Sequence, residues 1–291
     1  MAAKKKVASK KKASVKNKST NKSSSTAMVN WDEKLAQDAE IAAGVEAGTG
    51  GGQFFSTQGG QLSWQDAPLP NNEMVVVVLD SIFDNVFYLD SYDPDNPSSP
   101  TCFALGRSEE DMAPHADVIE QGTHQSTTTC DECEHNEWGT ADVGRGKACR
   151  NTRRLALIPA GTIDRDGDIE LYEDPAHFSA AQIGYLRLPV TSVKAYANYV
   201  KQVAGVMKRP PYGIATKVSL VPDAKTQFKV VFEPLDKLDN ELMGAVSERN
   251  EEAKSLIDFP YQLDDEEEQQ APPKRAASKK NPRKKRSARK Y

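Results

Sequence analysis

The sequence predicts an α+β fold dominated by strands, with an irregular insert in a globular body and a basic tail at each end. Residues 74–79 (MVVVVL) form a β-branched apolar run, and two turn-like dipeptides elsewhere separate pairs of strand-like segments. All four cysteines fall between Cys102 and Cys149, in a stretch with little apolar periodicity. Runs of strands with separate helical segments are typical of α+β domains.

Charge divides the 291 residues into three parts. Residues 1–26 hold nine lysines and no acid, and residues 271–291 hold ten lysines and arginines and no acid. Residues 27–270 hold the other 19 basic residues and all 42 acidic ones, a formal charge of −23. Low-complexity basic segments repel themselves and bury little, which predicts disorder. The predicted parts are a disordered tail at 1–29, a body at 30–263 with an insert at about 100–154, and an acidic run followed by a disordered basic tail at 264–291.

The chain has no apolar run near the roughly 20 residues that a membrane-spanning helix needs. Its lysine-rich N-terminal segment is not followed by the apolar stretch of a secretory signal. We therefore expect a cytoplasmic protein without a membrane partner, in the host cytoplasm if a phage encodes it. In a reducing compartment, cysteines bind metal more often than they form disulfides.

The N-terminal part of the body predicts a helix and then a hairpin. The helix begins with Asn30 as its N-cap and ends at the glycines of residues 48–52. Segments 53–58 and 61–65 flank Gly59-Gly60, a two-residue hairpin signal.

The following segments predict a sheet and two helices. Residues 74–79 lack polar alternation, which indicates a strand buried on both faces, whereas the pattern of residues 82–89 fits either a strand or a short helix. Beyond the insert we expect strands at 154–158, 169–172 and 184–188, a helix at 192–206, a hairpin of 214–221 and 227–232 around Asp223-Ala224, and a last helix at about 238–257.

The cysteine spacing predicts one structural zinc site. Two residues separate Cys130 from Cys133, so one tight turn can present both thiolates to one ion. Cys102 and Cys149 would complete a closed, non-catalytic site that fastens the insert to the body. His124 or His135 could replace Cys102 as the fourth ligand. Unpaired buried cysteines, disulfides and a redox pair are the other interpretations of these residues.

A dense basic segment surrounds the last cysteine. Residues 145–154 hold five basic side chains and no acid, and Gly144 and Gly146 expose backbone amides beside them. Such a segment suits a nucleic-acid backbone, which binds through neutralised phosphates. The predicted phosphate contacts are Arg145, Lys147, Arg150, Arg153 and Arg154. Alternatively, these side chains are solvated and pair with the nearby Asp131, Glu132, Glu134 and Glu137.

Two segments, Cys130-x2-Cys133-x2-Asn136-x-Trp138-Gly139-Thr140 and GRGKACRNTRRLALI (144–158), carry a resemblance. They resemble uncharacterised tailed-phage proteins that look like replication-associated single-stranded DNA-binding proteins with a cysteine-rich zinc insert, over about residues 70–235. By analogy with phage single-strand binders that hold a zinc subdomain, the resemblance implies an OB-like β-barrel core and single-stranded DNA, or alternatively RNA, as ligand. It also implies that an acidic segment recruits replication proteins. Its candidates are Asp264, Asp265, Glu266, Glu267 and Glu268.

Binding of single strands also needs aromatic side chains on which bases stack. The candidates are Trp138, Tyr185 with Arg187, and Tyr212 beside Lys208 and Arg209. Each of these aromatics could instead belong to the core.

No sequence motif indicates an enzyme. Asp164-x-Asp166-x-Asp168 suggests a calcium loop, but Ile169 stands where an EF-hand needs glycine, so we interpret the segment as a turn. There is no P-loop, no HExxH, no G-x-S-x-G and no kinase motif set.

Three functions therefore compete. The first is a non-catalytic single-stranded DNA-binding protein of phage DNA replication or recombination. The second is a zinc-ribbon module that binds a polymerase or another protein, with nucleic-acid contact through the tails alone. The third is a structural protein whose tails condense DNA. The tails add sequence-independent affinity for nucleic acid, fold back on the acidic body, or act as localisation signals.

Overall fold

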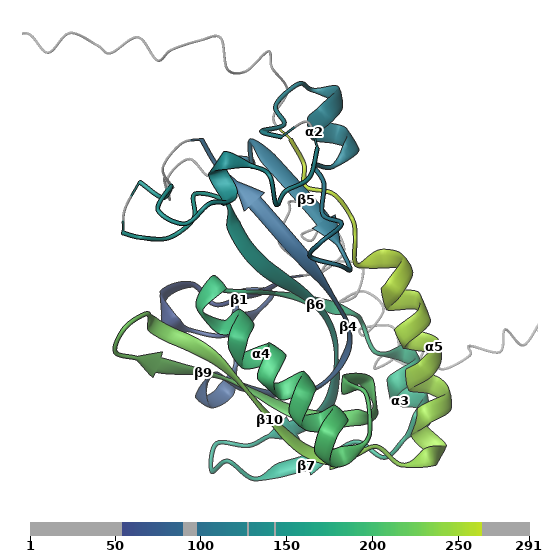
Figure 1. The fold of residues 1–291 in the computed structure, drawn as a ribbon. Coiled ribbons are helices and arrows are strands. Elements are labelled where there is room, and N and C mark those ends of the chain that lie inside the picture. The colour runs from purple at the N-terminus through teal and green to yellow at the C-terminus, as the bar shows by residue number, and fades with distance from the viewer. Residues whose placement is uncertain (1–53, 90–97, 127, 143, 264–291) are drawn as a thin grey trace, which may run out of the picture. The chain divides into compact units, whose positions relative to one another are not determined.

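A ten-stranded mixed sheet forms the centre of the fold (Figure 1). The computed structural model describes residues 54–89, 98–126, 128–142 and 144–263, which fall in one compact unit. The helix predicted from Asn30, both basic tails and the acidic run of residues 264–268 lie outside the described residues. The predicted α+β class is confirmed.

The sheet has the strand order β10-β9-β4-β6-β8-β1-β2-β3, with β5 added beside β4 and β7 beside β6. Strands β1 and β8 run parallel, and the other described pairings are antiparallel. The strands are β1 (Phe54–Ser56), β2 (Ser63–Trp64), β3 (Ala67–Pro68), β4 (Glu73–Phe87), β5 (Cys102–Gly106), β6 (Arg150–Ile163), β7 (Ile169–Leu171), β8 (Gly184–Leu188), β9 (Ile214–Asp223) and β10 (Gln227–Lys237).

Helices cover both faces of this sheet. Helix α4 (Val190–Gln202) continues into a π turn (Val203–Met207) and packs Tyr196 and Tyr199 on one face. Helices α3 (Pro175–Ala180) and α5 (Asn240–Leu256) contact each other and cover the opposite face, as Figure 1 shows.

Strand β4 lies in the middle of the sheet and is buried on both sides. Val75, Val77 and Leu79 belong to the core under α3 and α5, whereas Met74, Val76 and Val78 belong to the core under α4. A side chain of this kind contributes about 1.5–3 kcal/mol when it is fully buried. The predicted burial of this run on both faces is therefore confirmed.

The predicted OB-like barrel is wrong, because the sheet is open. Its order ends at β10 on one side and at β3 on the other, and these two strands do not pair within the described chain. A closed barrel encloses one apolar face. Here both faces are apolar, and each needs its own layer of helices.

Most predicted elements are confirmed, with shifted ends. Residues 82–89 do not form a separate element, because β4 continues as one strand to Phe87, with a register shift between Val78 and Asp80. The first hairpin is present as β1 and β2, although its connection is a 3-10 turn at Gln58–Gly60. The second hairpin pairs β9 with β10, and α5 begins two residues later than predicted.

The irregular insert lies where β4 ends and β6 begins (Figure 1). We call its described residues 98–126, 128–142 and 144–149 the cysteine lobe. Strand β5 pairs with the end of β4, and the lobe also holds the five-residue helix α2 (Ala116–Glu120) and a 3-10 turn at Glu134–Asn136. Its own core cluster is small: Ala104, Met112 and Cys130, with Phe83 against them.

None of the helices in the described part of the chain has the length and apolarity needed to cross a membrane.

Candidate metal centre and its basic border

The four cysteines converge on one cavity in the cysteine lobe. Cys102 begins β5, Cys130 and Cys133 lie on the loop before the 3-10 turn, and Cys149 directly precedes β6. The cavity has a volume of about 20 Å³, comparable with the space that a single water molecule needs. The remaining lining residues are Asn85, Phe87, Phe103, Ala104, Pro114, Gln125, Ser126, His135 and Asn136.

Backbone hydrogen bonds hold these cysteines in place. The Cys130 amide donates to Met112 O at 2.7 Å, and the Cys149 amide donates to His135 O at 2.8 Å. The Asn136 amide donates to Cys133 O at 2.9 Å, while its side-chain Nδ2 donates to Cys130 O at 2.7 Å. Asn136 therefore braces the turn that carries both thiols of the Cys-x2-Cys pair.

The electrostatics of the thiols reflect burial and mutual proximity. Burial first, and then the charges of the other cysteines, raise the pKa of Cys130 to about 11 and that of Cys149 to about 12. Burial, with the charge of Cys133, also raises the pKa of Cys102. Without a metal, the thiols of Cys102, Cys130 and Cys149 are therefore protonated near neutral pH, and a cation among the cysteines would favour the thiolates.

The donor set fits a thiophilic metal such as zinc. No carboxylate lines the cavity, and four sulfurs are a donor set that zinc prefers. The thiols are not in a finished ligand geometry, because no group of three or more Cys, His, Asp or Glu side chains in the described ranges is arranged to hold an ion. A zinc site would place each of the four sulfurs about 2.3 Å from one ion.

The two histidines predicted as alternative ligands differ in their position relative to the cavity. His135 lines the cavity and stacks on Phe87 with a centroid distance of 4.2 Å, whereas His124 does not line it. Because Cys102 reaches the cavity as predicted, four sulfurs are available without either histidine.

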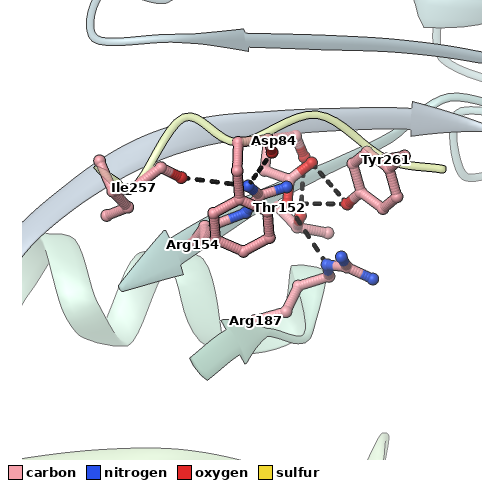
Figure 2. A network of polar contacts seen from close by, with 7 residues as sticks. Asp84, Thr152, Arg154, Arg187, Ile257 and Tyr261 are labelled. Atoms are coloured by element: carbon pink, nitrogen blue, oxygen red, sulfur yellow. Dashed lines mark hydrogen bonds and ion pairs between the residues drawn. The ribbon is translucent and has the colours of Figure 1, made fainter. Parts of the chain in front are cut away.

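A buried ionic network lies on β4, β6 and β8 below the lobe, and sequence analysis did not anticipate it (Figure 2). Asp84 is fully buried, and its Oδ2 lies 3.3 Å from Nε of Arg154 and 3.3 Å from Nε of Arg187. The Tyr261 hydroxyl donates to Asp84 at 2.8 Å, and Arg154 Nη1 donates to the carbonyls of Ile257 and Phe259. The network therefore fastens the segment after α5 to the sheet.

The groups of this network shift one another's pKa values. Burial raises the pKa of Tyr261, and the Asp84 charge raises it further. Burial would lower the pKa of Arg187, but Tyr261, Asp84 and Tyr88 outweigh that effect and raise it. The signal in the sequence was Asp84 itself, an acid beside the apolar residues Ile82, Phe83 and Val86, where an unpaired buried charge is very unfavourable.

Two predicted phosphate contacts, Arg153 and Arg154, lie deeper than the other predicted contacts of the same basic segment. Arg154 is 1% exposed and its guanidinium is used within the network, so it does not reach a phosphate. Arg153 is half-buried, with its guanidinium carbon 3.4 Å from the ring centroid of Phe83, and burial lowers its pKa. Its position against the Phe83 ring indicates a packing role.

The other predicted contacts stay near the surface. Trp138 is 79% exposed, and Lys147 Nζ lies 5.9 Å from its ring centroid while donating to Asn136 Oδ1 at 3.1 Å. Arg145 and Arg150 are exposed, and Arg150 lies over the Tyr88 ring at 5.4 Å. We call Trp138, Arg145, Lys147 and Arg150 the basic ledge.

The acids near the ledge do not neutralise it. Asp131, Glu132, Glu134 and Glu137 are exposed. Over the described ranges, none of the ion pairs involves a cation of the basic ledge. This disfavours the alternative that the ledge cations serve only as partners of those acids.

The second predicted basic loop is remote from the ledge. Helix α4 begins just after Leu188, the strand partner of Arg153, and its 13 residues span about 20 Å. Lys208 and Arg209 follow the far end of α4, and Tyr212 packs against the core. Tyr185 is 4% exposed, so it is not a platform either.

A larger cavity of about 390 Å³ lies between the first hairpin and the sheet. Phe55 and Trp64, whose ring centroids are 4.4 Å apart, form one wall, and Met74, Val76 and Leu157 contribute to the floor. Glu73 is its one charged lining residue among those described. A pocket with this lining does not suit a ligand that carries phosphates.

The Asp164–Asp168 segment is a turn, as predicted. Asp164 Oδ1 accepts hydrogen bonds from the amides of Asp166 and Asp168, both at 2.9 Å.

Comparison with known proteins identifies no family for this chain. No protein-family model, no curated protein sequence and no solved structure matches this chain.

Proposed function

We propose that the protein is a non-catalytic single-stranded DNA-binding protein of phage DNA replication or recombination, acting in the cytoplasm of the host. The observation that carries the proposal is Trp138, a 79% exposed aromatic with the Lys147 ammonium above its ring. An exposed aromatic beside cations is the combination that single-strand binders use, because bases stack on the ring while cations contact phosphates.

Two further features support this function. The body carries a formal charge of −23 over residues 27–270, so most of its surface repels a phosphate backbone. The basic ledge is a region where cations stand without acidic partners. A base also has to leave its duplex before a Trp ring can stack on it, which favours single strands over double strands.

The tails and the acidic run fit the same function. Nineteen basic residues in the two tails add sequence-independent, salt-sensitive affinity for nucleic acid. The acids of residues 264–268 are then the surface for replication proteins.

The test compares variants of the full chain on a single-stranded DNA oligonucleotide and on the matching duplex, by fluorescence anisotropy over a series of salt concentrations. Trp138→Ala should weaken binding to the single strand by about 5- to 150-fold, the equivalent of one lost stacking contact. Ile119→Ala is the matched control, because Ile119 is an apolar side chain of the same lobe that is 51% exposed.

A second pair of variants tests the phosphate contact. Lys147→Ala should reduce the slope of log affinity against log salt by about 0.7 for a single strand. Lys194→Ala, an exposed lysine on α4, should leave the slope unchanged. The proposal is wrong if Trp138→Ala and Ile119→Ala bind alike, and tighter binding of a single-stranded RNA oligonucleotide would change the ligand from DNA to RNA.

A second candidate function rests on the same lobe. Leu89, Ile119 and Trp138 are large apolar side chains that are more than half exposed at or near the lobe, as in surfaces that dock proteins. This favours a zinc-ribbon module that binds a polymerase or another protein. In that case Trp138→Ala would abolish a protein contact and leave DNA affinity unchanged.

A further inference from the structure

We infer that Cys102, Cys130, Cys133 and Cys149 bind one Zn²⁺, and that the bound metal holds the basic ledge in its binding position. The second half of the inference rests on the proposed function, whereas the metal site itself does not.

Convergence is the first argument for the metal. The four thiols come from chain positions spread over 48 residues, yet they line the same cavity of about 20 Å³. They are also the full set of cysteines in the chain. Four thiols, of which Cys130 and Cys133 are buried and Cys102 and Cys149 half-buried, with no carboxylate among them, provide little for hard cations such as Mg²⁺ or Ca²⁺, and suit zinc.

Weak packing of the lobe is the second argument. Between β5 and β6, the described residues form one five-residue helix and one 3-10 turn. The buried cluster of the lobe holds Ala104, Met112 and Cys130, with Phe83 from β4 against them, and Phe103 and Val118 are further buried apolar side chains between β5 and the end of α2. A segment of this length with so small a core needs a cross-link to stay folded, and a tetrathiolate metal site supplies one.

A chain of hydrogen bonds connects the proposed site to the ledge. Asn136 donates its amide to Cys133 O and its Nδ2 to Cys130 O, and its Oδ1 accepts from Lys147 Nζ at 3.1 Å. Lys147 in turn lies over Trp138. Asn136 is therefore a positioning residue between the metal ligands and the ledge.

The loop that carries Trp138 is closed at both ends by the cysteines. The Gly139 and Ala141 amides both donate to Gly146 O, at 2.9 and 3.2 Å. The Ala148 amide donates to Thr140 Oγ1, which also donates to His135 O at 3.2 Å. The base of this loop lies between Cys133 and Cys149, so a metal that joins these two thiols fixes both ends of it.

The charge expected for the zinc-bound site is compatible with a lysine close to it. Zinc with four thiolates has a net charge of −2, and Lys147 is the cation that acts on Cys149. A bound metal would therefore attract Lys147, which lies two residues before Cys149 in the chain.

The first experiment measures metal on the full chain. Elemental analysis of protein purified in the presence of zinc should give one zinc per chain, and Co²⁺ added to the metal-free protein should give the intense visible absorption of a tetrahedral tetrathiolate. Cys149→Ser and Cys130→Ser should lose the metal, while His135→Ala and His124→Ala should keep it. Absence of stoichiometric zinc, with four free thiols by titration, would overturn the site.

The second experiment measures order without relying on DNA. Hydrogen exchange followed by mass spectrometry should show faster exchange over residues 128–149 after chelation, with β9 and β10 unchanged. Because this measurement uses the wild-type chain, it tests the inference even if a cysteine variant misfolds. Equal exchange of that segment with and without zinc would overturn the coupling between metal and ledge.

The third experiment links the metal to the proposed function. Chelation should weaken single-strand binding at least as much as Trp138→Ala does, and it should weaken binding by the Trp138→Ala variant by a smaller factor than binding by the wild type. Asn136→Ala should retain zinc yet bind the single strand more weakly than the wild type. If zinc binds and orders the lobe but neither chelation nor Asn136→Ala changes DNA affinity, the metal site stands and its coupling to DNA binding is wrong.

Discussion

Asp84 and Arg154 form an ion pair from which solvent is excluded, with side-chain exposures of 0% and 1% (Figure 2). They project from β4 and β6 on the side of the sheet that α5 covers. Arg187 adds a second cation and Tyr261 two hydrogen bonds to the same carboxylate. A buried charge of this kind is stable only when its partners are complete.

Asp84→Asn should therefore be strongly destabilising. The substitution leaves Arg154 buried without a counter-charge, which costs about 3–5 kcal/mol in comparable pairs. Urea denaturation followed by circular dichroism measures the loss. Asp111→Asn, at an exposed position, should change the free energy of unfolding by less than about 0.5 kcal/mol. Equal midpoints for the two variants would show that the network adds nothing to stability.

Asn250→Ala should destabilise the fold, because it leaves a buried backbone carbonyl without its hydrogen-bond donor. Asn250 is 3% exposed and donates from Nδ2 to Leu79 O at 2.7 Å, beside the register shift of β4. Removing the donor leaves a buried carbonyl unsatisfied, at a cost of about 1–3 kcal/mol. Ser247→Ala, at an exposed position of the same helix, is the control and should be nearly neutral. A neutral effect of Asn250→Ala in thermal denaturation would contradict this role.

Alkaline pH should weaken the fold through Tyr199. Burial raises its pKa from 10.0 to about 12, so the folded state keeps a proton that the unfolded state loses. Stability from this group is complete below pH 10 and falls by about 1.4 kcal/mol per pH unit as the pH rises toward 12. Denaturant titrations across this range should show a shallower decline for Tyr199→Phe.

A matched variant separates ionisation from hydrogen bonding at this position. Tyr199 and Thr216 share a hydrogen bond of 2.6 Å between their hydroxyl oxygens. Thr216→Val removes the bond but keeps the buried phenol, so its alkaline decline should stay as steep as that of the wild type. If the free energy of unfolding of Tyr199→Phe falls with pH as steeply as that of the wild type, the decline comes from other tyrosines.

Gly184→Ala should disturb the first hairpin. A Cβ atom at residue 184 would stand 2.7 Å from Phe55 Cε2 and 2.8 Å from Trp64 Cζ3, which is closer than packed atoms come. Such overpacking costs about 1–3 kcal/mol and should shift the fluorescence of Trp64. Gly244→Ala on α5 meets no atom within 4 Å and should stabilise the helix by up to about 1 kcal/mol. A Gly184→Ala variant as stable as the wild type would mean that the two rings move aside freely.

Local patterns were sufficient to predict most elements. The apolar run of residues 74–79 predicted burial on both faces, and the two turn signals predicted both hairpins, since side-chain alternation and turn geometry depend on near neighbours. The same patterns left residues 82–89 undecided. The structure continues β4 through them because their backbone pairs with β5 and β6, which no local pattern can show.

The candidate site was predicted in part for the same reason. The cysteine spacing predicted a common site, and all four thiols do line one cavity. Among the predicted cations, the sequence contained no sign that Arg154 is buried while Arg150 is exposed, because both lie in one basic run. Their depths differ because β6 passes from the surface at Arg150 into the sheet at Arg154.

The sequence by itself determined the segregation of charge, the strand and helix content and the grouping of the cysteines. These are properties of composition and of neighbours along the chain. Only the tertiary structure decided that the sheet is open rather than closed, that Asp84 sits between two arginines, and that Trp138 is exposed beside Lys147. Those outcomes depend on which distant segments share a face of the sheet, and packing of the whole body, rather than any local pattern, sets that choice.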